Sequence, residues 1–133
     1  MHKREQENGV ASLKGKQGVA RIIAASGNSM KGFSAAWLNE AAFREECYLL
    51  CVFFPAAFWL GQTAAQIALL LMSCFIVLIV ELLNTAVEVV VDRVSMERHE
   101  LSGRAKDVAS AAVFLSLAQV LVVWGLITWQ RFA

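Results

Sequence analysis

The sequence predicts an all-α membrane protein with one N-terminal helix on the membrane surface and three transmembrane helices. Of its 133 residues, 58% are hydrophobic and only 17% are charged, whereas soluble domains usually contain about 25% charged residues. The charges are also unevenly placed, because residues 47–80 form an uncharged run of 34 residues and residues 108–130 another of 23. The formal net charge of +1 argues against a nucleic-acid-binding protein.

The two uncharged runs divide into three predicted membrane spans. As a single helix the first run would be about 50 Å long, whereas the hydrocarbon core of a bilayer is roughly 30 Å thick. Residues 61–66, Gly-Gln-Thr-Ala-Ala-Gln, form the polar and flexible segment in that run, which is typical of a tight turn between antiparallel helices. We therefore expect spans at about residues 42–60, 67–91 and 108–129.

The distribution of Lys and Arg predicts how the chain is oriented in the membrane. Residues 1–44 contain seven of them, residues 91–107 contain four, and residues 61–66 contain none. Because positively charged segments remain on the cytoplasmic side, we expect a cytoplasmic N-terminus and second loop, and a C-terminus on the outer side of the membrane.

Residues 21–41 are predicted to form a helix that lies in the membrane plane. Its large or apolar residues recur at spacings of three and four, which places them on one helix face: Met30, Phe33, Trp37 and Ala41. Gly27 and Gly32 predict a break early in this helix. Residues 1–20 are expected to form a mobile cytoplasmic tail, and residues 21–133 a single domain.

Two glutamates lie within the second predicted span. Glu81, Asn84 and Glu88 are separated by three and four residues, so they project from one stripe of a helix. A carboxylate in a membrane span costs about 2.5 to 3.5 kcal/mol on insertion scales, and this pair should therefore face a protein-lined or wet cavity near the cytoplasmic interface. Hydrogen bonding between helices would explain Asn84 but not two acidic residues, so we favour a functional site.

Charged residues are concentrated after this span. Residues 92–107 contain eight formal charges and His99, and Lys106 and Asp107 lie where the third span begins, at a depth close to that of Glu88. Cationic donors beside carboxylates that can hold a divalent metal favour a phosphate-bearing substrate. The sequence contains neither a Walker A loop nor a Gly-x-Gly-x-x-Gly motif, so a nucleotide would be held by side chains and metal.

Four segments of the chain resemble bacterial integral-membrane diacylglycerol kinases. They are AAWLNEAAFRE at residues 35–45, VELLNTAVE at 80–88, VDR at 91–93 and HELSGRAKD at 99–107. The resemblance implies an ATP- and Mg²⁺-dependent kinase of the bacterial inner membrane that converts 1,2-diacylglycerol to phosphatidate and recycles lipid. It also implies one surface helix and three transmembrane helices per chain, and a homotrimer whose subunits share active sites.

The resemblance further implies roles for individual residues. Glu81 resembles the general base that accepts the proton of the lipid hydroxyl, and Glu40 and Glu88 resemble metal-binding carboxylates. The positions similar to nucleotide-binding residues of the family are Arg21, Asn28, Glu40, Glu88, Glu97, His99, Lys106 and Asp107. The positions similar to its lipid-binding residues are Arg21, Ala25, Ser34, Ala35, Trp37, Glu45, Glu81, Asn84 and Ser110. Three residues replace family aromatics: Asn28, Met30 and Arg98.

Two other functions are compatible with parts of this pattern. An undecaprenol kinase of the same superfamily would use the same Glu81, although residues 35–45 and 101–107 are more similar to the diacylglycerol enzymes. A small non-catalytic cation or proton conductor could use Glu81 and Glu88, but it would have no need for the charged residues around position 106.

Overall fold

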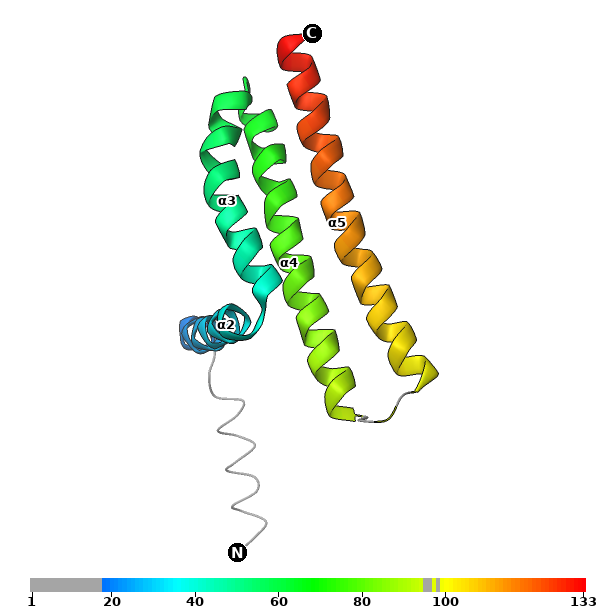
Figure 1. Ribbon diagram of the computed structural model, residues 1–133. Helices are drawn as coiled ribbons and strands as arrows, with labels where there is room; N and C mark the ends of the chain where they lie inside the picture. The colour runs from blue at the N-terminus through cyan, green and yellow to red at the C-terminus, as the bar shows by residue number, and fades with distance from the viewer. Residues whose placement is uncertain (1–17, 95–96, 98) are drawn as a thin grey trace, which may run out of the picture. The chain divides into compact units, whose positions relative to one another are not determined.

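The computed structural model describes residues 18–94, 97 and 99–133, and helices account for most of them. These helices are α2 (Val19–Asn39), α3 (Ala41–Leu60), α4 (Ala64–Val94) and α5 (Glu100–Phe132) (Figure 1). The helix α2 belongs to one compact unit, and residues 39–133 form a second. The predicted all-α fold is confirmed.

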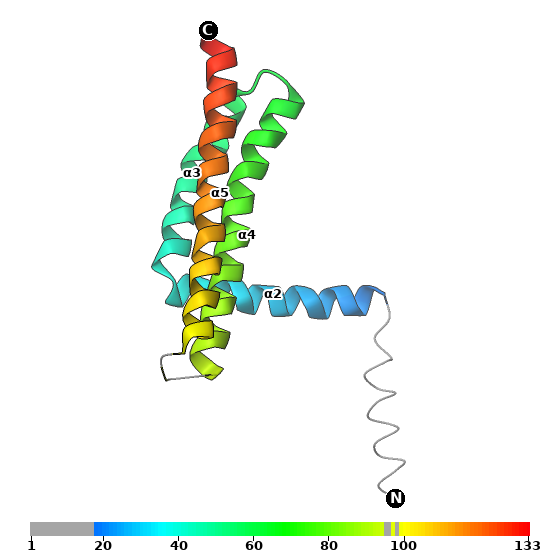
Figure 2. The same ribbon diagram turned by 90° about the vertical axis from the view of Figure 1, so that its right-hand side faces the viewer.

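The second unit is a bundle in which α3, α4 and α5 lie side by side (Figure 1 and Figure 2). The helix α4 is in the middle and packs against both of its neighbours, whereas α3 and α5 have few contacts with each other. A small apolar core lies near the α3–α4 turn and is formed by Ala57, Leu60, Leu70 and Ile127, with Leu71, Val123 and Trp124 packed against them. The predicted site residues of α4 and α5 lie toward the opposite end of these two helices.

Two helices of the bundle, α4 and α5, are long and apolar enough to cross a membrane. Only 22% and 11% of their most apolar stretches are buried, whereas a core helix of a soluble protein would be mostly buried. These observations support an all-α membrane protein. The helix α3 has three charged residues near its start, Arg44, Glu45 and Glu46, which leave residues 47–60 as its uncharged part, and its membrane span stays a prediction.

The helices α4 and α5 extend beyond the predicted spans of residues 67–91 and 108–129. The helix α5 begins at Glu100, eight residues before the expected span. His99 caps its start, because the Nδ1 atom of His99 accepts a hydrogen bond of 3.1 Å from the backbone N–H of Leu101. A capped polar segment can remain helical outside the apolar layer, so Lys106 and Asp107 lie on a helix.

The turn between α3 and α4 is shorter than the six residues expected. Only Gly61, Gln62 and Thr63 separate the two helices. The Oγ1 atom of Thr63 accepts a hydrogen bond of 3.2 Å from the backbone N–H of Gln66. This bond satisfies an N–H at the start of α4, and residues 64–66 therefore belong to the helix.

The helix α2 is continuous through Gly27 and Gly32, so the expected break at these residues is wrong. A glycine in a helix interior costs only about 1 kcal/mol relative to alanine, which does not end a helix of 21 residues. The helix begins at Val19 and ends at Asn39, two residues earlier at each end than predicted. Its location on the membrane surface stays a prediction, and residues 1–17 of the predicted tail lie outside the described residues.

Gly61, which ends α3, offers a test of packing at the turn. A Cβ atom at this position would lie 2.5 Å from Cγ1 of Ile67 and 3.0 Å from the carbonyl oxygen of Ala57. Because overpacking typically costs about 1–3 kcal/mol, we expect Gly61→Ala to lower the free energy of unfolding by that amount, measured by thermal unfolding in detergent. Gly125→Ala is the control, since no described neighbour would lie within 4 Å of its Cβ. Equal destabilisation by both substitutions would contradict this account.

Candidate active site

Glu81 lies among the carboxylates of three other residues. It is on α4 and only 5% exposed. Glu40, Glu46 and Glu88 are close enough for their charges to interact with its carboxylate. Glu40 directly precedes α3, Glu46 lies on α3, and Glu88 lies on α4. The structure thus brings acidic residues of two neighbouring helices together around Glu81, and we name these four residues the carboxylate cluster.

Helix geometry explains how α4 contributes two members of the cluster. Glu81 and Glu88 are seven residues apart, which is close to two helical turns, so both lie on the same side of α4. Asn84 lies between them, and its Nδ2 atom donates a hydrogen bond of 3.4 Å to Oε1 of Glu88. The predicted stripe of Glu81, Asn84 and Glu88 is therefore present in the structure.

Glu46 is the cluster member that the sequence prediction did not include. The prediction named Glu45, which is exposed, whereas Glu46 is half-buried. A signal for Glu46 is present in the sequence, because Phe43 lies three residues before it and Leu50 lies four residues after it. Such spacing places Glu46 on the apolar face of α3, which packs against α4.

Several polar oxygens around the cluster are buried without a hydrogen-bond partner. Within the described part of the chain they are Oε2 of Glu46, Oδ1 of Asn84 and Oγ1 of Thr85. Leaving a buried polar group unpaired costs about 1–3 kcal/mol. The arrangement can therefore accept hydrogen bonds or a cation from a ligand.

A cationic residue of α5 interacts with one member of the cluster. The Nζ atom of Lys106 is 2.6 Å from Oδ1 of Asp92, and the charge of Lys106 also interacts with that of Glu88. Asp92 was not among the predicted site residues, although it lies four residues after Glu88 on the same side of α4. Lys106 thus joins α5 to the acidic stripe of α4, and its side chain keeps 42% of its surface exposed.

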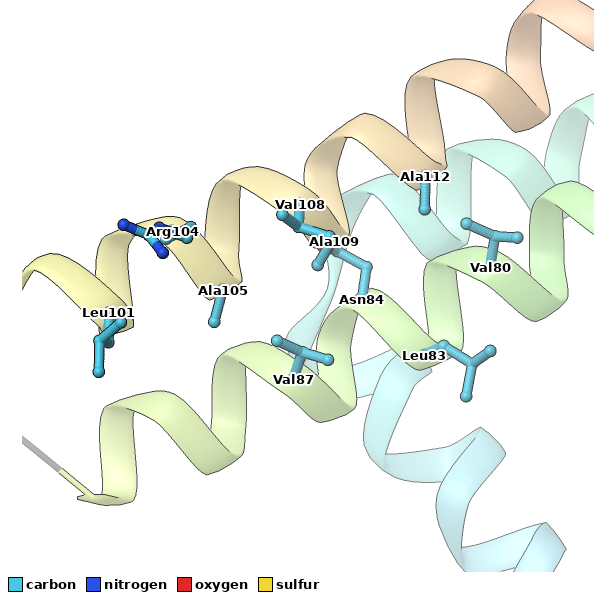
Figure 3. Close-up of a pocket in the computed structure, with 10 residues that line it drawn as sticks. All are labelled: Val80, Leu83, Asn84, Val87, Leu101, Arg104, Ala105, Val108, Ala109 and Ala112. Atoms are coloured by element: carbon cyan, nitrogen blue, oxygen red, sulfur yellow. The ribbon is translucent and has the colours of Figure 1, made fainter.

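An apolar groove of about 540 Å³ lies between α4 and α5 beside this site. Its lining residues are Val80, Leu83, Asn84, Val87, Leu101, Arg104, Ala105, Val108, Ala109 and Ala112. Figure 3 shows Asn84 and Val87 pointing from α4 toward α5, and Ala105 pointing toward α4. Because Asn84 also bonds Glu88, the groove adjoins the carboxylate cluster.

The remaining predicted site residues lie elsewhere on the chain. Asp107 and Ser110 are exposed on α5, and Glu97 and His99 precede that helix. Six predicted residues are exposed on α2, which belongs to the other unit: Arg21, Ala25, Asn28, Ser34, Ala35 and Trp37. Their participation in the site stays a prediction, and Arg98 lies outside the described residues.

Comparison with known proteins identifies the family of the chain. The model of the family described as prokaryotic diacylglycerol kinase matches residues 27–128. The diacylglycerol kinase of Haemophilus influenzae is 50% identical over 108 residues, which cover 81% of this chain and 92% of that relative. The chain belongs to the prokaryotic diacylglycerol kinase family.

Other relatives in this kinase family show the same level of similarity. The diacylglycerol kinase of Escherichia coli K12 is 48% identical over 115 residues, 86% of this chain and 94% of the relative. The diacylglycerol kinase of Pseudomonas aeruginosa is 49% identical over the same length and shares of the two chains. The predicted family and the predicted enzyme class, a kinase, are confirmed.

The kinase resemblance predicts Mg²⁺ at Glu40 and Glu88, and their surroundings can be compared with what this ion requires. No group of three or more His, Cys, Asp and Glu residues in the described ranges is arranged to hold a metal ion. Mg²⁺ needs fewer protein ligands, because it usually binds one or two carboxylates together with water and substrate phosphates. The charges of Glu40 and Glu88 both act on Glu81, and Glu88 lies beside Asn84, whose Oδ1 atom is buried and unpaired. These donor types fit this ion.

Proposed function

We propose that the chain is an ATP- and Mg²⁺-dependent kinase that converts 1,2-diacylglycerol to phosphatidate at the cytoplasmic face of the bacterial inner membrane. The observation that carries this proposal is the similarity to relatives named diacylglycerol kinase, which extends over 92% and 94% of their lengths. The carboxylate cluster, with Lys106 beside it, supplies the residue types that phosphoryl transfer to a hydroxyl requires.

Glu81 accepts the proton of the lipid hydroxyl in the proposed reaction. The oxygen of that hydroxyl attacks the γ-phosphorus of ATP, the bond between this phosphorus and the β–γ bridging oxygen breaks, and ADP leaves. A general base must lie within hydrogen-bond reach of the proton that it removes. Burial of Glu81 on α4 fits this role, because an acyl-chain substrate reaches the site from the apolar part of the membrane.

Charge neutralisation is the second requirement of the proposed reaction. Phosphoryl transfer depends mainly on positioning and on electrostatic stabilisation of the phosphate oxygens. Lys106 contributes a positive charge that orients the polyphosphate, while its contact with Asp92 fixes the position of its ammonium group. Glu40 and Glu88 would hold Mg²⁺, which when bound neutralises phosphate charge.

The proposal extends to the assembly and its orientation. Three helices offer little enclosure for a polar site, and much of the apolar surface of α4 and α5 is exposed in a single chain. A homotrimer with shared active sites would cover such surface and bring α2 of one chain to the cluster of another. The excess of Lys and Arg before α3 and around α5's start favours a cytoplasmic N-terminus and a periplasmic C-terminus.

A comparison of two lipid substrates tests the proposed function. Purified protein in mixed micelles is given ATP with labelled γ-phosphate, Mg²⁺, and either diacylglycerol or undecaprenol. We expect labelled phosphatidate from diacylglycerol, little product from undecaprenol, and loss of turnover when EDTA removes Mg²⁺. A preference for undecaprenol would instead identify an undecaprenol kinase. Failure to phosphorylate either lipid would refute the proposal and favour the non-catalytic conductor.

A further inference from the structure

A partly buried polar cluster joins α4 to α5 away from the proposed active site. Its centre is Ser73 of α4, which is only 2% exposed. The Nε2 atom of Gln119 donates a hydrogen bond of 2.8 Å to the carbonyl oxygen of Ser73, and Nε1 of Trp124 donates one of 3.1 Å to its Oγ atom. Ser73 precedes Glu81 by eight residues, or about 12 Å along the helix. We name Ser73, Gln119 and Trp124 the Ser73 cluster.

The geometry of the Ser73 cluster restricts how α5 slides along α4. The hydroxyl of Ser73 donates a hydrogen bond of 2.7 Å to the carbonyl oxygen of Leu70, so its lone pairs face the indole N–H of Trp124. Hydrogen bonds weaken steeply with distance and misalignment, and a slip of one residue moves a helix by about 1.5 Å. Apolar helix contacts in lipid lack this directionality. The two bonds from α5 to a single residue of α4 therefore favour one axial register.

Trp124 also connects the cluster to the third helix of the bundle. Its ring packs edge-on against that of Phe53 of α3, with 4.8 Å between the ring centroids. The place where α4 and α5 are joined by hydrogen bonds is thus held against α3 as well, and α5 is fixed relative to both helices that carry the carboxylate cluster.

We propose that Gln119 and Trp124 are positioning residues that set the axial register of α5 against α4 through Ser73. The register determines where Lys106 meets Asp92 and Glu88, because these residues lie on the same two helices. This inference about the register rests on the proposed function in one respect, namely that Lys106 binds the polyphosphate of the nucleotide. The register itself is a property of the helix pair and is measured without substrate.

The chain offers a matched pair of serines for the test. Ser73 and Ser116 are both buried, at 2% and 4% exposure. Each hydroxyl donates a 2.7 Å hydrogen bond to the carbonyl three residues earlier. Among the described residues, the hydroxyl of Ser73 also accepts a hydrogen bond from the neighbouring helix, whereas that of Ser116 bonds only within its own helix. Ser73→Ala and Ser116→Ala therefore remove the same intrahelical bond, and they differ in the bond between helices.

The experiment measures the register and the kinetics of the same variants. Spin labels are attached at Val89 of α4 and Phe114 of α5, which are 61% and 72% exposed, in a chain whose three native cysteines are replaced. Distances between the labels are measured by pulsed electron paramagnetic resonance. Labelled chains are diluted with unlabelled ones, so that each distance is between two labels of the same chain. Turnover is measured at a temperature well below unfolding, with kcat and the KM for ATP determined separately.

We expect Gln119→Leu and Ser73→Ala to shift or broaden the label distance and to lower kcat by about tenfold, since misplacement by 1 Å can cost about 10²-fold in rate. Ser116→Ala should leave the label distance unchanged and kcat within about twofold of the parent chain.

A lower unfolding temperature with unaltered distances and kcat would overturn the proposal, because the cluster would then only stabilise the fold. If the parent chain has no kinase activity, the proposed function fails, while the distances still decide the register. If Gln119→Leu does not fold, the two serine variants decide alone.

Discussion

Glu81→Gln should reduce the rate of phosphoryl transfer to diacylglycerol by about 10²–10⁴-fold, the contribution typical of a general base. The amide has nearly the size of the carboxylate but cannot accept the hydroxyl proton. The variant also removes a negative charge from among Glu40, Glu46 and Glu88, so folding and nucleotide binding should persist. The loss is measured as kcat in mixed micelles, with nucleotide affinity determined separately by equilibrium binding.

Glu100→Gln provides the control for this substitution. Glu100 lies at the start of α5, its side chain is 84% exposed, and it undergoes the same change of charge. We expect its kcat to stay within about twofold of the parent, as for most exposed substitutions. Equal turnover of Glu81→Gln and the parent chain would remove Glu81 from the role of base. An equal loss in both variants would point to net charge as the cause.

The local spacing of residues explains why much of α4 could be predicted. Glu81, Asn84 and Glu88 share a stripe because the helical period is 3.6 residues, and the hydrogen bond from Asn84 to Glu88 follows from this spacing. The cost of carboxylates in an apolar span identifies the same residues as unusual. The helical period and the free-energy cost of burying a carboxylate both depend on one segment of the chain. They can therefore be predicted without knowing which helices pack against that segment.

Contacts between helices were harder to predict, as Glu46 and Asp92 show. Whether Glu45 or Glu46 faces α4 depends on a rotation of about 100° per residue, which only the apolar positions Phe43 and Leu50 reveal. The pairing of Asp92 with Lys106 depends on the axial register of two helices. Such registers are set by contacts far apart in sequence, among them Gln119 with Ser73.

Helix ends were also difficult to place from hydropathy. The apolar run marks the part of a helix that lies in lipid, whereas the helix continues until its last N–H and C=O groups find partners. His99 supplies such a partner for α5, and Thr63 supplies one for α4. For this reason α5 includes Lys106 and Asp107, which hydropathy alone placed at its very edge.

Lys106→Gln should lower kcat/KM for ATP by about 10²-fold, the lower end of the range for losing one group that stabilises transition-state charge. Lys106 lies on α5 beside Asp92 and Glu88 of α4, where it is the proposed partner of the polyphosphate. Its 42% exposure places it partly in water, which weakens its electrostatic contribution and sets our expectation at that lower end. The loss is measured by steady-state kinetics over a range of ATP concentrations at fixed Mg²⁺.

Arg104→Gln removes the same charge from α5, two residues earlier, and serves as the matched control. Arg104 pairs with Glu100 at 3.1 Å, and both side chains are largely exposed, at 65% and 84%. Exposed pairs of this spacing contribute only about 0.3–0.5 kcal/mol to stability, and exposed substitutions usually have small effects, so we expect kcat/KM for ATP to change by less than about twofold. If both substitutions lower kcat/KM for ATP equally, the net positive charge of this segment would explain the effect, and the position of Lys106 would not. A loss confined to Lys106→Gln would instead show that the position of the positive charge matters. The ion pair with Asp92 places the ammonium group of Lys106 beside the acidic stripe of α4.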